Sequence, residues 1–124
     1  MADRREYNRQ WYAAHREDQR RKKSLYWQRN KQRRKAYSFA WNLRVKFGLT
    51  PDQYQILLET QQGHCLICSK TKDDIGRNLS VDHDHKTGRI RGLLCDNCNV
   101  GLGHFFDSPS LLKRAADYLE RQNG

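Results

Sequence analysis

Two pairs of cysteines with identical spacing are the first residues in this sequence that could carry chemistry. Two residues separate Cys65 from Cys68 and Cys95 from Cys98, and twenty-six residues lie between the pairs. Four thiolates presented by two such turns can surround a tetrahedral Zn²⁺ ion. A site with four sulfur ligands has no open position, so we predict a structural zinc that stabilises the fold.

Three other uses of these cysteines compete with zinc binding: two disulfides, a redox-active Cys-x-x-Cys pair, and unligated core cysteines. The sequence begins without the apolar stretch of a secretory signal, so a reducing cytoplasm is the expected location. A reducing compartment disfavours disulfides, and the matched pairs disfavour the other two uses. No run of eighteen apolar residues is present, which excludes a simple membrane span.

A second group of candidate residues lies between the cysteine pairs. Asp82, His83, Asp84 and His85 follow one another, and Asn99 comes immediately after Cys98. On composition alone, a solvated loop explains the first four equally well. The predicted zinc ties both ends of this segment together, however, and so brings Asp82 and His83 close to the turn that carries Asn99. One carboxylate and one amide oxygen suit a hard cation such as Mg²⁺ or Mn²⁺, and an imidazole can accept a proton from water near neutral pH.

Three stretches together resemble the phage recombination endonuclease VII family, within the wider HNH or ββα-metal nucleases. They are Cys-Leu-Ile-Cys at 65–68, Leu-Ser-Val-Asp-His-Asp-His at 79–85, and Gly-Arg-Ile-Arg-Gly-Leu-Leu-Cys-Asp-Asn-Cys-Asn at 88–99. The resemblance covers about residues 54–104. It implies a zinc-braced ββα site that cleaves duplex or branched DNA, such as four-way junctions.

Carried over by position, the resemblance implies that Asp82 and Asn99 bind the catalytic Mg²⁺ or Mn²⁺ ion. It makes His83 the general base and His85 an accessory group near the scissile phosphate. The family also implies a homodimer, but the long basic arm and short tail of this chain do not map onto its dimerising helices. Two competing functions stay open: a non-catalytic zinc-binding nucleic-acid module, and an HNH nuclease used for nicking, homing or packaging.

The elements that position these residues can be read from composition and local signals. The chain has 124 residues, of which 36% are hydrophobic and 31% charged, so the core must be small. We predict a small α+β fold with two parts, a mostly helical arm over 1–47 and a zinc-braced nuclease domain over 48–124. Thr50-Pro51-Asp52-Gln53 predicts a capped helix ending near Gly63, residues 79–83 and 89–94 predict a hairpin, and a last helix is expected after Pro109.

Positive charge is concentrated in the arm. Residues 1–46 carry fifteen Lys or Arg and four acidic residues, a net charge of +11, whereas the rest of the chain carries −1. A polyanion is therefore the expected partner, and we predict DNA contacts with little sequence preference. The candidate DNA-binding residues are Arg20, Arg21, Lys22, Lys23, Arg33, Arg34 and Lys35 in the arm, with Arg89 and Arg91 on the hairpin.

The arm also contains two aromatic pairs fifteen residues apart, Trp11-Tyr12 and Tyr26-Trp27. These rings could stack on exposed bases or pack on a partner helix, and packing is the favoured interpretation. Arg89 and Arg91 flank Ile90, and strand alternation predicts both guanidinium groups on one face of the hairpin. The same alternation forbids Asp82 and His83 from sharing a face, so the strand is expected to bend or end there.

Overall fold

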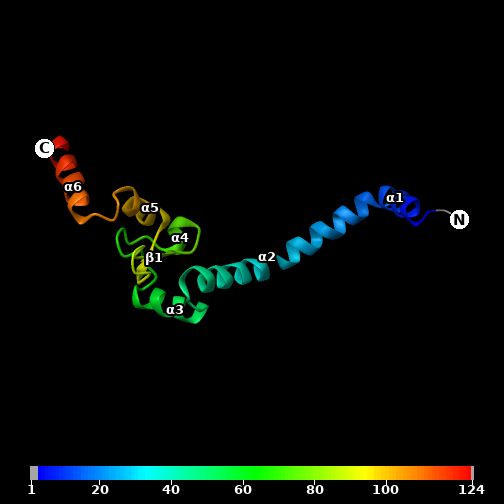
Figure 1. The fold of residues 1–124 in the computed structure, drawn as a ribbon, viewed down its shortest axis with the longest axis horizontal. Helices are drawn as coiled ribbons and strands as arrows, with labels where there is room; N and C mark the ends of the chain where they lie inside the picture. The colour runs from blue at the N-terminus through cyan, green and yellow to red at the C-terminus, as the bar shows by residue number, and fades with distance from the viewer. Residues whose placement is uncertain (1–2, 124) are drawn as a thin grey trace. The chain divides into compact units, whose positions relative to one another are not determined.

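A computed structural model describes residues 3–123 (Figure 1). Its elements, in chain order, are α1 (Arg4–Ala14), α2 (Arg16–Phe47), α3 (Pro51–Thr60), α4 (Lys72–Ile75), β1 (Ser80–His83), β2 (Ile90–Leu94), α5 (Asp96–His104) and α6 (Pro109–Asn123). The chain divides into two compact units, one up to Asn42 and one from Leu43. This is a small α+β architecture, as predicted. No helix in the described range is long and apolar enough to cross a membrane.

The first unit is helical, in agreement with its composition. The helix is interrupted at His15, whose backbone leaves the helical conformation between α1 and α2. The His15 Nδ1 atom lies 2.7 Å from the Trp11 carbonyl oxygen, so the imidazole binds the end of α1. At the far end of α2, Gly48 takes a left-handed φ of 66°, and its N–H donates to the Arg44 carbonyl. Gly48 therefore ends the helix, directly after the predicted helical arm over 1–47.

Helix α3 begins with the predicted capping box. The Thr50 Oγ1 accepts from the Gln53 N–H at 3.2 Å, and the Gln53 side chain accepts from the Thr50 N–H at 2.9 Å. The helix ends at Thr60, slightly earlier than expected. Its Tyr54 is buried, and the Tyr54 hydroxyl donates to the Leu79 carbonyl at 2.7 Å. This hydrogen bond joins α3 to the segment that leads into the hairpin.

The sheet of the second unit is a two-stranded antiparallel hairpin at the predicted position. Ser80 pairs with Leu94, Val81 with Leu93, and Asp82 with Gly92, after which the register shifts and His83 pairs with Ile90. Arg91 is thus an extra residue in β2, and β1 ends at His83. The predicted end of the strand at His83 is confirmed. The core beneath the hairpin is small, and its buried hydrophobic members are Leu43, Tyr54, Cys65, Leu79, Val81, Leu93, Leu94 and Cys95.

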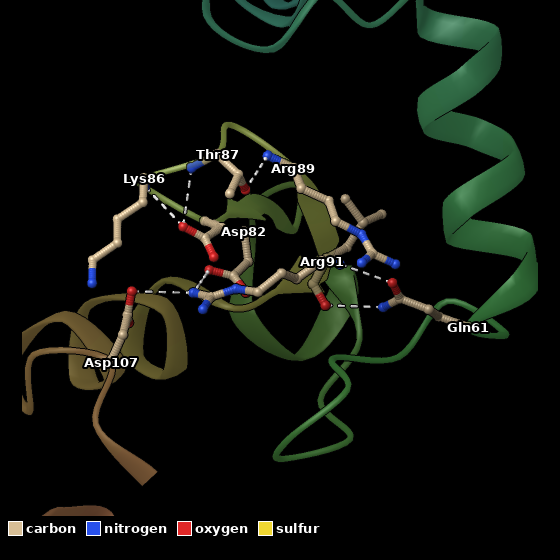
Figure 2. A network of polar contacts seen from close by, with 9 residues as sticks. Gln61, Asp82, Lys86, Thr87, Arg89, Arg91 and Asp107 are labelled. Atoms are coloured by element: carbon tan, nitrogen blue, oxygen red, sulfur yellow. Dashed lines mark hydrogen bonds and ion pairs between the residues drawn. The ribbon is translucent and has the colours of Figure 1, made fainter.

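Gln61 continues the hydrogen bonding of the hairpin with its side chain. Its amide Nε2 donates to the Leu93 carbonyl at 2.9 Å, and its Oε1 accepts from the Leu93 N–H at 2.8 Å. Figure 2 shows this side chain reaching the outer edge of β2. Both backbone groups of a fully buried residue are therefore satisfied by one glutamine.

Replacing Gln61 with methionine should lower the free energy of unfolding by about 1–3 kcal/mol. The Leu93 N–H would lose the Gln61 acceptor, and the Leu93 carbonyl would keep the longer bond of 3.4 Å from the Leu66 N–H. Denaturant unfolding of the zinc-bound protein measures this change. The matched control is Gln55→Met on α3, whose amide bonds only the exposed Glu59 at 3.2 Å. The control should change stability by less than about 0.5 kcal/mol. Equal effects of the two substitutions would contradict the role given to Gln61.

Candidate functional site

The four cysteines converge on one point, as their spacing predicted. The sulfur atoms of Cys65, Cys68, Cys95 and Cys98 all lie within 4.8 Å of one another, and none forms a disulfide. The Cys68 and Cys95 Sγ atoms are 3.5 Å apart. Tetrahedral coordination at a Zn–S distance of about 2.3 Å would place sulfur atoms about 3.8 Å apart, so these residues fit a zinc ion. In the described range, no other group of three or more Cys, His, Asp or Glu residues meets this condition.

Backbone hydrogen bonds shape both cysteine turns. In the first turn, the Cys65 N–H donates to the Lys70 carbonyl at 2.9 Å, and Ser69 takes a left-handed φ of 63°. The His64 Nδ1 lies 2.7 Å from the Ser69 carbonyl oxygen, so this histidine braces the turn from outside. In the second turn, Cys95 is the N-cap of α5, and its sulfur accepts from the Cys98 N–H at 3.4 Å.

The cysteines differ in how readily they form thiolates. Burial raises the pKa of Cys65, but hydrogen bonds from the N–H groups of Cys68, Cys95 and Ile67 outweigh it and bring the pKa to about 6. Burial, followed by contacts with the neighbouring sulfur atoms, raises the pKa of the Cys98 thiol. One thiolate therefore forms readily, and further thiolates need a cation to offset their mutual repulsion.

Asp82 lies next to the extra residue of β2. This aspartate is only 7% exposed. Its carboxylate accepts two hydrogen bonds of 2.8 Å from Arg91, one from Nε and one from Nη2. Arg91 Nη2 also lies 3.4 Å from an Asp107 oxygen on the segment after α5. Figure 2 shows the guanidinium between the two acids. The hydrogen bonds with Asp82 raise the pKa of the Arg91 guanidinium, so this cation stays charged.

This arrangement corrects the predicted placement of the two hairpin arginines. Arg89 precedes β2, and the register shift leaves Arg91 unpaired in the ladder, so simple strand alternation does not apply to them. The predicted phosphate contact of Arg91 competes with its bidentate bond to Asp82. Asp107, which no motif in the sequence points to, is the third member of this cluster.

His83 and His85 lie together at the end of β1. Their ring centroids are 4.6 Å apart, and the Phe47 ring lies 5.3 Å from His83. Between them, Asp84 closes the hairpin turn, since its Oδ1 accepts from the Lys86 N–H at 2.8 Å and the Thr87 N–H at 3.3 Å. Asp84 is thus a turn residue. Beside it, His83 is half-buried and His85 is exposed.

Asn99 lies in the first turn of α5, and its N–H donates to the Cys95 carbonyl at 2.9 Å. Helix α5 packs against β1, the strand that carries Asp82 and His83. Asp96 adds to this packing, because its carboxylate accepts from the Ser80 hydroxyl and pairs with Arg77 at 2.5 Å. The cysteine cluster therefore includes the start of α5, the helix that carries Asn99 and packs against the strand with Asp82 and His83.

Several arm cations already have partners. Asp18 pairs with Arg21 at 3.1 Å and with Lys22 at 2.8 Å, and the Arg34 guanidinium lies 3.6 Å above the Trp27 ring. These are exposed contacts and cost little to exchange for a phosphate. The arm residues predicted to bind DNA thus lie on the surface of one helix.

The sequence of this chain is similar to those of known phage proteins. Two similar proteins are the Gene 59 proteins of Mycobacterium phages D29 and L5. The first is 45% identical over 87 residues, covering 68% of this chain and 52% of its own length. The second is 46% identical over 85 residues, covering 66% and 51%. This chain therefore spans about half the length of the curated relatives it matches. Residues 40–121, which include the whole cysteine cluster and hairpin, match the family described as recombination endonuclease VII, and the chain belongs to that family.

Proposed function

We propose that this protein is a metal-dependent DNA endonuclease that hydrolyses phosphodiester bonds at an HNH-type site and prefers branched DNA. The observation that carries the proposal is the position of three residues in an endonuclease VII family member. Asp82 and His83 lie on β1, and Asn99 lies on α5, which packs on that strand beside the cysteine cluster.

The donor set suits a hard cation. Asp82 and Asn99 offer a carboxylate and an amide oxygen, and two protein ligands are common for Mg²⁺ or Mn²⁺, which keep several waters. The negative charge of buried Asp82 is now balanced by Arg91, and a divalent ion is a natural replacement for that guanidinium. Bound there, such an ion would stabilise the charge that develops on the phosphate and the leaving oxygen.

The protein side chains supply the remaining steps. His83 takes a proton from the water that attacks phosphorus, because a neutral imidazole carries one nitrogen that accepts a proton. His85, with its ring 4.6 Å from that of His83, contacts the phosphate. Arg91 is 36% exposed at its side chain, so a guanidinium released from Asp82 would lie at the surface and could pair with a phosphate oxygen.

One observation favours a second candidate, a zinc-binding nucleic-acid module without catalysis. A carboxylate that accepts two 2.8 Å bonds from arginine is satisfied without a metal ion. In such a module, His83 and Asn99 would have no catalytic role. The two candidates therefore differ in whether DNA is cut.

The deciding experiment incubates the full chain with supercoiled plasmid, linear duplex and a four-way junction. Each is tested with Mg²⁺, with Mn²⁺, and with Ca²⁺ as the control, because a chelator would also remove the zinc. We expect cutting with Mg²⁺ or Mn²⁺, fastest on the junction. Tight binding of all three DNAs without cutting in either metal would support the binding module instead.

Neutralising three arm cations should weaken binding to duplex DNA and reduce its dependence on salt. In the variant Arg33→Gln, Arg34→Gln, Lys35→Gln, the slope of log affinity against log salt should fall by up to about 2.7, or about 0.9 for each phosphate that is no longer neutralised. The matched control removes three cations from α6 (Lys113→Gln, Arg114→Gln, Arg121→Gln) and should leave the slope nearly unchanged. Identical slopes for both variants and the native chain would show that the arm does not contact the DNA backbone.

A further inference from the structure

An open groove of about 810 Å³ follows the surface of the first unit where α1 passes into α2. Two tyrosines and four cations form most of its lining: Tyr12, Arg16, Arg20, Lys22, Lys23 and Tyr26. Within the described chain, no acidic residue lines this groove. The groove is therefore positively charged, and its aromatic residues are Tyr12 and Tyr26.

The sequence spacing explains why these side chains share one face. Residues 12, 16, 20, 23 and 26 follow one another at intervals of three or four, the spacing of neighbours on a helical surface. The break at His15 does not interrupt the row, because the groove includes residues from both helices. Arg16, Arg20 and Lys23 thus lie between the two tyrosines.

Three of these cations are available to a ligand. Asp18 pairs with Lys22 and with Arg21, outside the row. Arg16, Arg20 and Lys23 have no ion pair within residues 3–123. A row of such cations attracts a chain of phosphates.

The tyrosines differ from the neighbouring tryptophans in what they contact. Trp11 stacks on His15 at a centroid distance of 4.3 Å, and Trp27 lies beneath the Arg34 guanidinium. Tyr12 and Tyr26 meet these tryptophans at near right angles and remain 62% and 60% exposed. Two exposed rings on a basic groove can stack on a ligand that offers flat faces.

We propose that this groove binds single-stranded DNA, with the backbone along Arg16, Arg20 and Lys23 and with unpaired bases stacked on Tyr12 and Tyr26. A paired duplex offers its phosphates to the same cations but keeps its base faces inside the stack, so it gains nothing from the tyrosines. Branched DNA such as a fork or a flap carries single-stranded segments, and the choice of DNA over RNA rests on the function proposed above. The groove therefore lets the arm distinguish single-stranded DNA from duplex DNA, which its positive charge alone does not.

The test measures fluorescence anisotropy of a labelled dT oligonucleotide, a hairpin duplex with equal phosphate number, and the matching rU oligonucleotide. The full chain is used in Ca²⁺, so that cutting does not affect the result. Tyr12→Leu and Tyr26→Leu should each weaken dT binding by about 5- to 150-fold and leave duplex binding unchanged. Arg20→Gln should weaken both. Leucine favours helix formation more than tyrosine, so the helices persist in these variants.

Tyr7→Leu is the control, because Tyr7 is 63% exposed on α1 but lies outside the groove. Equal losses of affinity for Tyr7→Leu and Tyr12→Leu, equal losses on dT and duplex, or tighter binding of rU than dT would each overturn the proposal. So would dimers, seen by analytical ultracentrifugation, that dissociate in Tyr12→Leu or Tyr26→Leu, since the rings would then pack on a second copy. If the chain binds dT through these tyrosines but cuts no DNA, the proposed binding site is supported and only the proposed nuclease function is contradicted.

Discussion

Replacing His83 with alanine should lower the rate of DNA cutting by about 10²–10⁴-fold while zinc content and DNA affinity stay near those of the native chain. The reason is that a positioned general base contributes an acceleration of about this size. Single-turnover cleavage of the preferred DNA in Mg²⁺ measures the chemical step without product release. Zinc is measured by mass spectrometry, and DNA affinity is measured in Ca²⁺.

Two further variants separate a catalytic role of His83 from a structural one. The His83 ring lies 5.3 Å from Phe47, so alanine also removes packing, whereas His83→Asn retains more of the side-chain volume without a base. Both variants should cut equally slowly. His104→Ala, at the end of α5, is the matched control and should cut like the native chain. Recovery of activity in His83→Asn, or loss of zinc in parallel with activity, would assign His83 to packing.

Local signals predicted most of the elements because their causes lie within a few residues. Thr50, Pro51 and Gln53 specify the start of α3, and Gly48 specifies the end of α2. The cysteine spacing likewise predicted the cluster, since each turn presents two sulfur atoms without help from distant residues. The short helix α4 was missed, although Thr71 and Asp74 form a capping box at its start. Four residues provide too little apolar periodicity to reveal a helix.

The contacts that sequence reasoning missed join residues far apart in the chain. Gln61 bonds Leu93, and Asp107 reaches Arg91, but neither pair leaves a periodic pattern in the sequence. The extra residue in β2 was equally hidden, because it depends on how the two strands align. Arg91 shows the consequence: alternation predicted its guanidinium on the same face of the hairpin as that of Arg89, whereas the register shift accompanies its pairing with Asp82.

The Arg91 pairing also changes how the candidate site should be understood. A carboxylate that is 7% exposed needs a counter-charge at all times, and Arg91 provides one in the absence of a divalent ion. An ion bound at Asp82 would replace that counter-charge and leave Arg91 with Asp107 alone, at the longer distance of 3.4 Å. Asp82 and Arg91 therefore belong to one electrostatic unit, and a substitution at either residue alters the other.

Replacing Cys95 with serine should abolish zinc binding and unfold the second unit. Structural zinc sites contribute about 10–16 kcal/mol to the folding of small domains. This is more than the net stability that we expect from a core of eight buried hydrophobic residues in the described range. Hydrogen exchange measures the result directly: amides of β1 and β2 should lose protection, while those of α1 should not change. Ile67→Ser, between two ligands and 55% exposed, is the control and should retain zinc. Protected β1 and β2 amides in zinc-free Cys95→Ser would refute a structural role for the metal.

The thiol pKa values add a pH dependence to this prediction. Zinc binds thiolates, and the pKa of Cys65 is lowered to about 6, whereas the pKa of Cys98 is raised. Binding must therefore expel protons from thiols that are neutral at pH 7, so zinc affinity should rise with pH and fall as pH drops. Calorimetry in buffers of different ionisation enthalpy counts the released protons, and at least one per zinc is expected at pH 7. Zero release would mean that all four thiolates already exist without the ion, against the repulsion that four adjacent negative charges impose.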